Sequence, residues 1–278
     1  MVEIKRFKRF EDFALFNEDF LNRNPMLYYF LSDTINKVYR GEVMVYNFFN
    51  IIDNKGNHLV LLLVKDFCLV YGNDFDEEMI LKLSQEMEFD KFKRYEFAGN
   101  KHVIDALFKL NSAEYKMQKH RIIYKCEETI QNFIYSPGSM EMGDLNKLDE
   151  LATLSVGFSE AYYGRKASFK QMREVMFKGI RDKNVYQWKY KNNICSIAQV
   201  IYDDYDFPVI GHFYTNPIFR KQGFGGSLIH SLTNVLLKVC HKFCMLSTDA
   251  GNPASNKVFI KVGYNNTGEY LLAYKEKY

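Results

Sequence analysis

The sequence predicts an α+β protein built from two domains of similar construction. Three observations carry this prediction: apolar residues recur three and four positions apart in several segments, short apolar runs alternate with those segments, and a faint repeat relates the two halves. A chain of 278 residues is long enough for two domains of ordinary size. The pattern breaks near residues 131–143, which predicts domains at 1–135 and 145–278.

In the second half, helical spacing of Leu228, Leu232 and Leu236 indicates a helix, Asn192-Asn193 indicates a turn between strands, and Pro253 suits the first turn of a helix. The predicted elements are helices at 144–158 and 169–180, strands at 185–190, 194–202 and 209–215, a helix at 227–239, a strand at 242–248, a helix at 254–262 and a closing strand at 271–274.

The first half repeats parts of the second at an offset of roughly 150 residues. Residues 91–100 and 242–252 both predict a short strand that ends in Ala-Gly-Asn and enters a helix. Residues 66–71 resemble 206–210 upstream, and Glu-Tyr pairs at 114–115 and 269–270 follow downstream. The matches keep their order, as expected of a duplicated unit.

The composition favours a cytoplasmic protein without nucleic-acid, membrane or metal partners. Net charge is only +3, from 37 Lys and Arg against 34 Asp and Glu, which gives no basic surface for a polyanion. The five cysteines are scattered without a Cys-x-x-Cys pair, so no metal site is expected. No apolar run reaches the roughly 18 residues of a membrane span, and the N-terminus lacks an apolar signal core.

Residues 220–227, Arg-Lys-Gln-Gly-Phe-Gly-Gly-Ser, predict an anion site between a strand and a helix. The first N–H groups of a helix have no intrahelical partner, and Gly223 and Gly225 would let the backbone approach a phosphate. The spacing is too short for the phosphate loop of NTPases and lacks one glycine of the dinucleotide fingerprint. A helix that merely follows glycines is the alternative.

A second motif follows at 249–264. There, Asn252, Ser255 and Asn256 are followed by an aromatic residue, Phe259, and by Gly-Tyr. Arg-x-x-Gly-x-Gly, helix, strand and this second motif, in that order, resemble the GNAT superfamily of acetyl-CoA-dependent N-acetyltransferases. The resemblance covers about 145–278 firmly and the first half only faintly. It implies two GNAT-like domains, each a mixed, mostly antiparallel sheet flanked by helices, and a sheet that splits where acetyl-CoA enters.

The resemblance also implies roles for single residues. The backbone of residues 213–215 would pair with the pantetheine arm like an added strand, and Asn252 would reach the same arm. For Asn252 the alternative is a helix cap, and for Arg220 a solvated turn residue. The full expected cofactor-binding set is Phe213, Tyr214, Thr215, Arg220, Lys221, Gln222, Gly223, Phe224, Gly225, Gly226, Ser227, Asn252, Ser255, Asn256 and Phe259.

The catalytic residues stay open because the chain departs from the family pattern twice. Phe259 stands where the family commonly has a tyrosine that protonates the departing thiolate, and residues 209–215 contain no carboxylate. An acceptor amine must lose a proton before or as it attacks. The candidate bases are Glu160, Tyr214 and Asp249, and further candidates are Tyr162, Tyr163, Asp206 and His212.

The first half has an acidic turn, residues 72–78, where the second half has its glycines. Carboxylates at a helix start satisfy the helix dipole themselves and would repel a pyrophosphate. The first half is therefore expected to be a degenerate GNAT-like domain that is structural or shapes the acceptor pocket.

The expected function is transfer of an acetyl group from acetyl-CoA to a primary amine of a small molecule or to an exposed amino group, by a monomer or homodimer. The alternative is a non-catalytic acyl-CoA-binding or sensing protein. A nucleotide-binding enzyme comes third, because the loop lacks the spacing of a phosphoryl-transfer site.

Overall fold

The computed structural model describes residues 1–65, 67–92, 95–202, 207–239 and 242–276. Asp206 and Cys240 therefore lie outside the described residues. The chain forms two compact units. The first comprises Met1–Ile123 and Thr267–Tyr278, and the second comprises Tyr124–Asn266.

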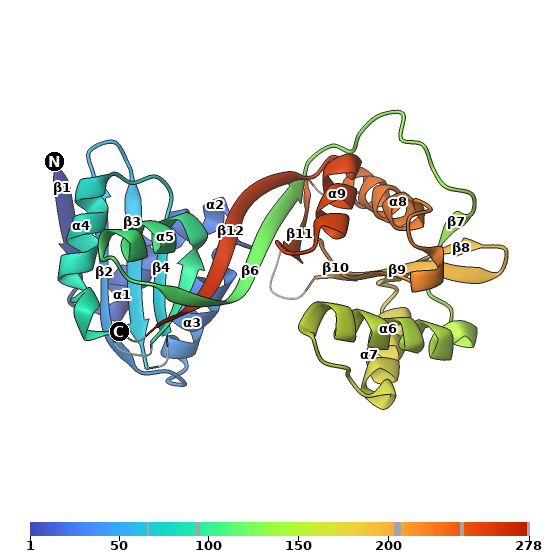
Figure 1. The fold of residues 1–278 in the computed structure, drawn as a ribbon, viewed down its shortest axis with the longest axis horizontal. Helices are drawn as coiled ribbons and strands as arrows, with labels where there is room; N and C mark the ends of the chain where they lie inside the picture. The colour runs from blue at the N-terminus through green and yellow to red at the C-terminus, as the bar shows by residue number, and fades with distance from the viewer. Residues whose placement is uncertain (66, 93–94, 203–206, 240–241, 277–278) are drawn as a thin grey trace. The chain divides into compact units, whose positions relative to one another are not determined.

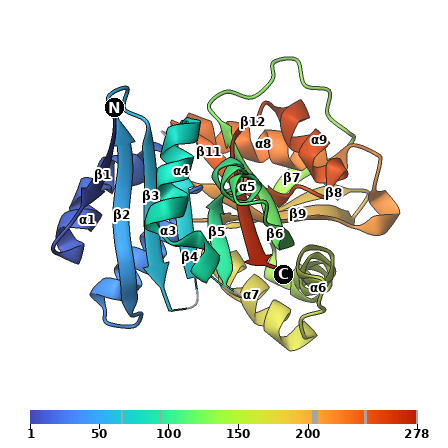
Figure 2. The same cartoon turned by 60° about the vertical axis from the view of Figure 1, so that its left-hand side comes forward.

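The first unit contains strands and helices in the order β1 (Val2–Arg6), α1 (Phe10–Phe16), α2 (Glu18–Arg23), α3 (Tyr29–Tyr39), β2 (Val45–Asp53), β3 (His58–Val64), β4 (Phe67–Gly72), α4 (Glu77–Glu86), β5 (Glu96–Asn100), α5 (Lys101–Leu110) and β6 (Tyr115–Cys126). Helices α4 and α5 pack on one face of its sheet (Figure 2). The rings of Phe89, Phe97 and Phe108 lie 5.0–5.8 Å apart in the core beneath them.

The second unit contains β7 (Ser139–Met142), α6 (Leu148–Tyr163), α7 (Phe169–Arg181), β8 (Val185–Tyr190), β9 (Asn193–Ile201), β10 (Val209–Thr215), α8 (Phe224–Lys238), β11 (Cys244–Asp249) and α9 (Pro253–Val262). The chain then enters β12 (Asn265–Lys275), most of which belongs to the first unit. Figure 1 shows α6 and α7 on one face of its sheet and α8 and α9 on the other. The turn between β8 and β9 has positive φ at Lys191 and Asn192, which matches a tight hairpin turn.

The two units repeat one topology, which confirms the internal repeat. Each has a strand, then helices, then three strands, and then a helix, strand, helix and strand. Within each, the first four strands pair antiparallel in order, and the fourth pairs parallel with the fifth. The sheets are mixed and mostly antiparallel, as the resemblance implies.

The last strand of each repeat departs from this order. In the first unit β5 is followed by β12, and in the second β11 is followed by β6. Residues 270–274 pair antiparallel with β5, from Tyr270 opposite Asn100 to Tyr274 opposite Glu96. The prediction that 271–274 closes the sheet of the second half is therefore wrong. The predicted boundaries also shift: residues 124–135 belong to the second unit and 267–278 to the first.

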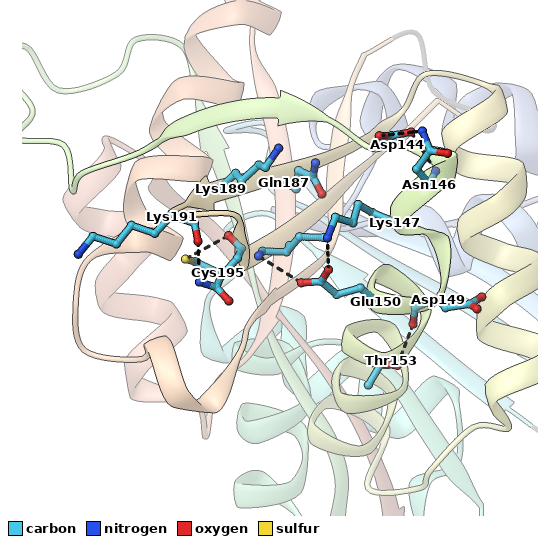
Figure 3. Close-up of polar contacts among 12 residues, drawn as sticks. Asp144, Asn146, Lys147, Asp149, Glu150, Thr153, Gln187, Lys189, Lys191 and Cys195 are labelled. Atoms are coloured by element: carbon cyan, nitrogen blue, oxygen red, sulfur yellow. Dashed lines mark hydrogen bonds and ion pairs between the residues drawn. The ribbon is translucent and has the colours of Figure 1, made fainter.

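The start of α6 is anchored by polar contacts that position the rest of this helix (Figure 3). The Asp144 side chain accepts the Asn146 N–H at 2.9 Å at the turn before the helix. Glu150 accepts from the Lys147 Nζ at 3.2 Å and, with its other oxygen, from the Ile194 N–H at 3.3 Å. These contacts join the first turns of α6 to the start of β9.

Candidate functional site

The glycine loop, residues 220–226, connects β10 to α8 and carries a row of unpaired N–H groups. Helix α8 begins at Phe224, three residues before the predicted start, because Gly223 caps it in the left-handed conformation with φ +82°. Ser227 is the first residue whose N–H finds a helical acceptor, the Gly223 carbonyl at 3.0 Å. Within the described residues, the N–H groups from Lys221 to Gly226 donate to no acceptor.

The geometry of this loop suits an anion. Lys221 and Gly223 have φ of +62° and +82°, while Arg220 has φ −67°, so the handedness of the backbone changes along the loop. Such alternation directs successive N–H groups into one concavity, and the helix dipole adds partial positive charge at the same point. Lys221 holds this conformation although it carries a Cβ, which costs about 1 kcal/mol.

Gly223 and Gly225, both predicted to let the backbone approach a phosphate, differ in their surroundings. Gly223 is exposed, and a Cβ on it would lie 2.6 Å from the Ser136 Oγ. Gly225 is buried, and a Cβ there would lie 2.6 Å from Thr215 Oγ1 and 2.8 Å from Phe213 Cζ. Gly225 therefore permits close packing of α8 on the end of β10. The approach of a phosphate to the loop stays a prediction.

The side chains of the loop divide between its exposed and buried sides. Arg220 Nε donates to the Thr215 carbonyl at 3.1 Å, and its guanidinium lies 5.2 Å from the centre of the Tyr214 ring. Arg220 therefore contacts the end of β10 while it stays exposed to solvent, as the alternative of a solvated turn residue allows. Its place in the cofactor-binding set stays a prediction. Phe224 is buried, so only its backbone can serve an anion. Ser227 is fully buried and its Oγ accepts the Ser136 N–H at 2.8 Å, so its place in the cofactor-binding set stays a prediction.

The sheet of the second unit opens beside this loop. Strands β10 and β11 are in register only at Val209 opposite Met245. The other edge of β10 stays paired with β9 as far as Thr215 opposite Ser196. The β10 edge beyond Val209 that faces β11 therefore leaves backbone groups available to an extended ligand, at the residues predicted for the pantetheine arm.

The equivalent place in the first unit is closed. Strands β4 and β5 pair from Phe67 opposite Glu96 to Val70 opposite Gly99. A Cβ on Gly99 would lie 1.7 Å from the Val70 carbonyl oxygen, and the Asn100 Oδ1 accepts the Gly72 N–H at 2.9 Å beyond the ladder. Helix α4 begins with Asp76 as its cap and Glu77 and Glu78 in its first turn, so carboxylates occupy the position of the glycine loop.

A bulge in β10 brings His212 against α6. The register shifts between Gly211 and Tyr214, and His212 has φ +51°, a strained value for a non-glycine residue. Its Nε2 lies 2.6 Å from the Ser155 Oγ, and its ring lies 4.2 Å from that of Phe158. Burial lowers the pKa of His212 from 6.5 to about 4, so the ring is neutral at neutral pH.

The other candidate bases lie apart from this bulge or pack against it. Tyr214 contacts α6, since a Cβ on Gly157 would lie 2.6 Å from its hydroxyl. Glu160 is exposed in the last turn of α6, and Tyr162 and Tyr163 also belong to this helix, not to the predicted linker. Asp249 is exposed and accepts the Gly251 N–H at 2.7 Å, as a turn residue does.

The start of α9 is held by asparagines. Asn252 caps the helix, its Oδ1 accepting the Ser255 N–H at 3.1 Å. Asn256 donates to the carbonyls of Asp249 and Asn252 at 3.2 and 2.8 Å, and its Oδ1 accepts the Tyr124 hydroxyl at 3.1 Å. The cap interpretation of Asn252 is therefore correct, while its contact with pantetheine stays a prediction. Ser255 is half-buried on the same turn.

Phe259 lies inside an aromatic cluster at the open end of the sheet. It is 4% exposed, and its ring is 5.6 Å from Phe213, 5.9 Å from Tyr124 and 6.1 Å from Tyr264. Tyr124 comes from β6, far away in the sequence, so the C-terminal motifs gave no signal of it. Ser136 was likewise missed, because Ser-Pro-Gly-Ser indicated only a break between domains.

No cluster of three or more His, Cys, Asp or Glu side chains in the described part of the chain is arranged to hold a metal ion. No helix there has the length and apolar character that a bilayer span requires.

Comparison with known proteins agrees with this geometry. Residues 190–272, which include β10, the glycine loop and α9, match the family model described as FR47-like protein. A GNAT-family acetyltransferase from Colwellia psychrerythraea aligns with a TM-score of 0.57 at 13% identity, over 99% of this chain and 100% of that one. A GCN5-related N-acetyltransferase from Sphaerobacter thermophilus aligns with a TM-score of 0.54 at 13% identity, over 87% and 85%. No curated protein matches the sequence. The resemblance to the GNAT superfamily is confirmed: the chain has the GNAT acetyltransferase fold, with an FR47-like segment that runs from the end of β8 into β12.

Proposed function

We propose that this protein is an acetyl-CoA-dependent N-acetyltransferase whose acetyl-CoA site lies in the second unit. One observation carries the proposal: the ladder between β10 and β11 ends at Val209, beside a glycine loop whose N–H groups are unpaired. A pyrophosphate needs the N–H groups and the helix dipole, and a pantetheine arm needs an open strand edge. Both features are adjacent in the second unit.

The chain would act mainly by holding two substrates in place. The edge of β10 would align the thioester, and a backbone N–H near Phe213 would stabilise negative charge on its carbonyl oxygen. The acceptor is a primary amine of a small molecule or an exposed amino group. His212 and Tyr214 are titratable side chains of the bulged segment, and the Arg220 guanidinium lies against the Tyr214 ring. His212 has a pKa of about 4 and would accept a proton from an ammonium group poorly.

The first unit is proposed to be a degenerate GNAT-like domain that does not bind acetyl-CoA. Its β4–β5 ladder is closed and its α4 N-terminus is acidic, so it lacks both features on which the proposal rests. The expected stoichiometry is therefore one acetyl-CoA per chain. A stoichiometry of two, measured by titration calorimetry, would contradict this assignment.

A non-catalytic acyl-CoA-binding or sensing protein is the second candidate. It is favoured by the enclosed Phe259, which offers no hydroxyl to the departing thiolate, and by the low pKa of His212. A thiol is acidic enough, with a pKa of about 8.5, to depart without a donor, so we prefer the enzyme.

Thiol release distinguishes the two. The full chain is incubated with acetyl-CoA and a panel of amines, and free coenzyme A is measured. Release that depends on one class of amine supports the transferase. Calorimetric binding of acetyl-CoA without release for any amine favours the second candidate. Absence of binding overturns both.

A further inference from the structure

A segment before β7, residues 129–138, is fixed along α8; we call it the strap. It passes α9 and α8 on its way to β7 (Figure 1). His230 of α8 is its main contact: one ring nitrogen bonds to the Ile130 carbonyl at 2.9 Å, and the other to the Tyr135 hydroxyl at 2.7 Å. The Phe133 ring stacks on His230 at 4.1 Å. The strap is therefore an ordered part of the second unit.

The strap ends on the glycine loop. The Ser136 hydroxyl donates to the Gln222 carbonyl at 2.7 Å, and the Ser136 N–H donates to Ser227 Oγ at 2.8 Å. Just beyond, the Trp188 indole N–H donates to the Pro137 carbonyl at 3.1 Å. Ser136 thus contacts residues on both sides of Gly223 and is itself held from the next position in the chain.

The contact with Gln222 fixes one peptide group of the loop. In a trans peptide the carbonyl and the following N–H point in opposite directions, and no cis bond occurs in the described chain. With the Gln222 carbonyl bound to Ser136, the Gly223 N–H faces away from the strap. Within the described residues, Ser136 is the only partner of that carbonyl. Gly223 has no side chain to restrict its φ, so the hydrogen bond from Ser136 is the direct hold on the orientation of this peptide.

A flip would exchange an N–H donor for a carbonyl oxygen at the anion site. The oxygen would repel a phosphate where the N–H attracts it. We propose that Ser136 is a positioning residue: it holds the Gln222–Gly223 peptide so that the glycine loop presents only N–H groups to the pyrophosphate of an acyl-CoA. This inference rests on the proposed function and assigns a role in it to a side chain outside both sequence motifs.

The test compares two ligands in calorimetry. Acetyl-CoA carries the pyrophosphate, and acetyl-pantetheine carries the same thioester arm without it. Ser136→Ala is expected to weaken acetyl-CoA by about tenfold, the usual effect of losing one hydrogen bond that organises a charged contact. Acetyl-pantetheine should change by less than about twofold. Ser139→Ala, an exposed serine three positions along, is the matched control and should leave both ligands unaffected.

An isosteric pair guards against a general effect on folding. Ser136→Thr keeps the hydroxyl and Ser136→Val replaces it with a methyl group, so the two differ little in volume. Acetyl-CoA affinity should stay near wild type in the first and fall about tenfold relative to it in the second. Equal weakening of both ligands, or equal affinity of the Thr and Val variants, would overturn the inference while leaving the proposed function intact. A wild-type chain that binds no acetyl-CoA would overturn the proposed function, and the inference with it.

Discussion

Replacement of Gly225 by alanine, compared with the same change at Gly226, tests the close packing of α8 on the end of β10. The added Cβ would lie 2.6 Å from Thr215 Oγ1 and 2.8 Å from Phe213 Cζ, distances that force α8 and the end of β10 apart. Overpacking of this kind costs about 1–3 kcal/mol. Gly226 is the matched control, since a Cβ there would lie 3.5 Å from Phe133 Cζ, an ordinary contact. Glycine to alanine in a helix otherwise stabilises by about 0.5–1 kcal/mol.

The two variants share the gain in helix propensity, so their difference in unfolding free energy isolates the clash at about 1–3 kcal/mol. Gly225→Ala should be the less stable of the two, and its affinity for acetyl-CoA should fall because the strand end and the loop move apart. Urea unfolding followed by circular dichroism, with calorimetry of acetyl-CoA, measures both. If Gly225→Ala is as stable as Gly226→Ala, the close packing of α8 on β10 is refuted. Gly225→Asp should show the larger loss on both measures, because it adds bulk and a negative charge.

Three further predictions follow. A chain that ends at residue 266 loses the strand paired with β5, including the buried Leu271 and Ala273. The first unit should then lose its cooperative thermal transition, because β5 becomes an unpaired edge. A thermal transition equal to that of the full chain would refute the pairing of β12 with β5. Phe259→Ala should lower the free energy of unfolding by about 3–5 kcal/mol and weaken acetyl-CoA binding, because it opens a cavity. Phe259→Tyr should keep turnover or raise it by up to about tenfold if the hydroxyl reaches the sulfur. A Tyr variant that binds acetyl-CoA but loses most turnover would show that Phe259 shapes the acceptor pocket instead. Burial lowers the pKa of His212 from 6.5 to about 4, so between these pH values the unfolded chain binds a proton that the folded chain does not. The free energy of unfolding should therefore fall as pH drops from 6.5 to 4, by at most about 1.4 kcal/mol per pH unit. His212→Asn, in which asparagine tolerates the positive φ, should reduce the difference in unfolding free energy between pH 7 and pH 4.5 in urea, while the contribution of His58 remains.

The sequence predicted most of the second unit because its local signals are strong. Strand β10 and the end of α9 lie where the pattern put them, and Gly263, with φ +119°, ends α9 as predicted. The start of α8 was placed too late, since glycines at 225 and 226 disfavour a helix by propensity and only packing on β10 includes them. The end of α6 was placed too early, at residue 158, because the helix continues to Tyr163 and ends at Gly164, which has φ +66°.

Long-range pairing could not be predicted. A strand pattern at 271–274 says that one face is buried, but not which edge it joins, and both β5 and β11 present a suitable edge. The resemblance implied a sheet that opens at the cofactor site, but the residue at which β10 leaves β11 and the closure of β4 on β5 depend on register, not on composition. Contacts from distant segments, such as Ser136 on the glycine loop and Tyr124 beside Phe259, carry no signal in either motif.

The sequence by itself therefore determined most elements of the second half, the duplication and the position of the glycine loop, because helix periodicity, glycines and caps act over a few residues. Only the tertiary structure decided which strand completes each sheet and how Ser136 holds the loop. These depend on strand edges and hydrogen bonds between residues separated by 80 residues or more, such as Ser136 and Gln222, whose separation in the chain is 86. Local sequence patterns do not encode such contacts, because only the folded chain brings the two groups within hydrogen-bonding distance.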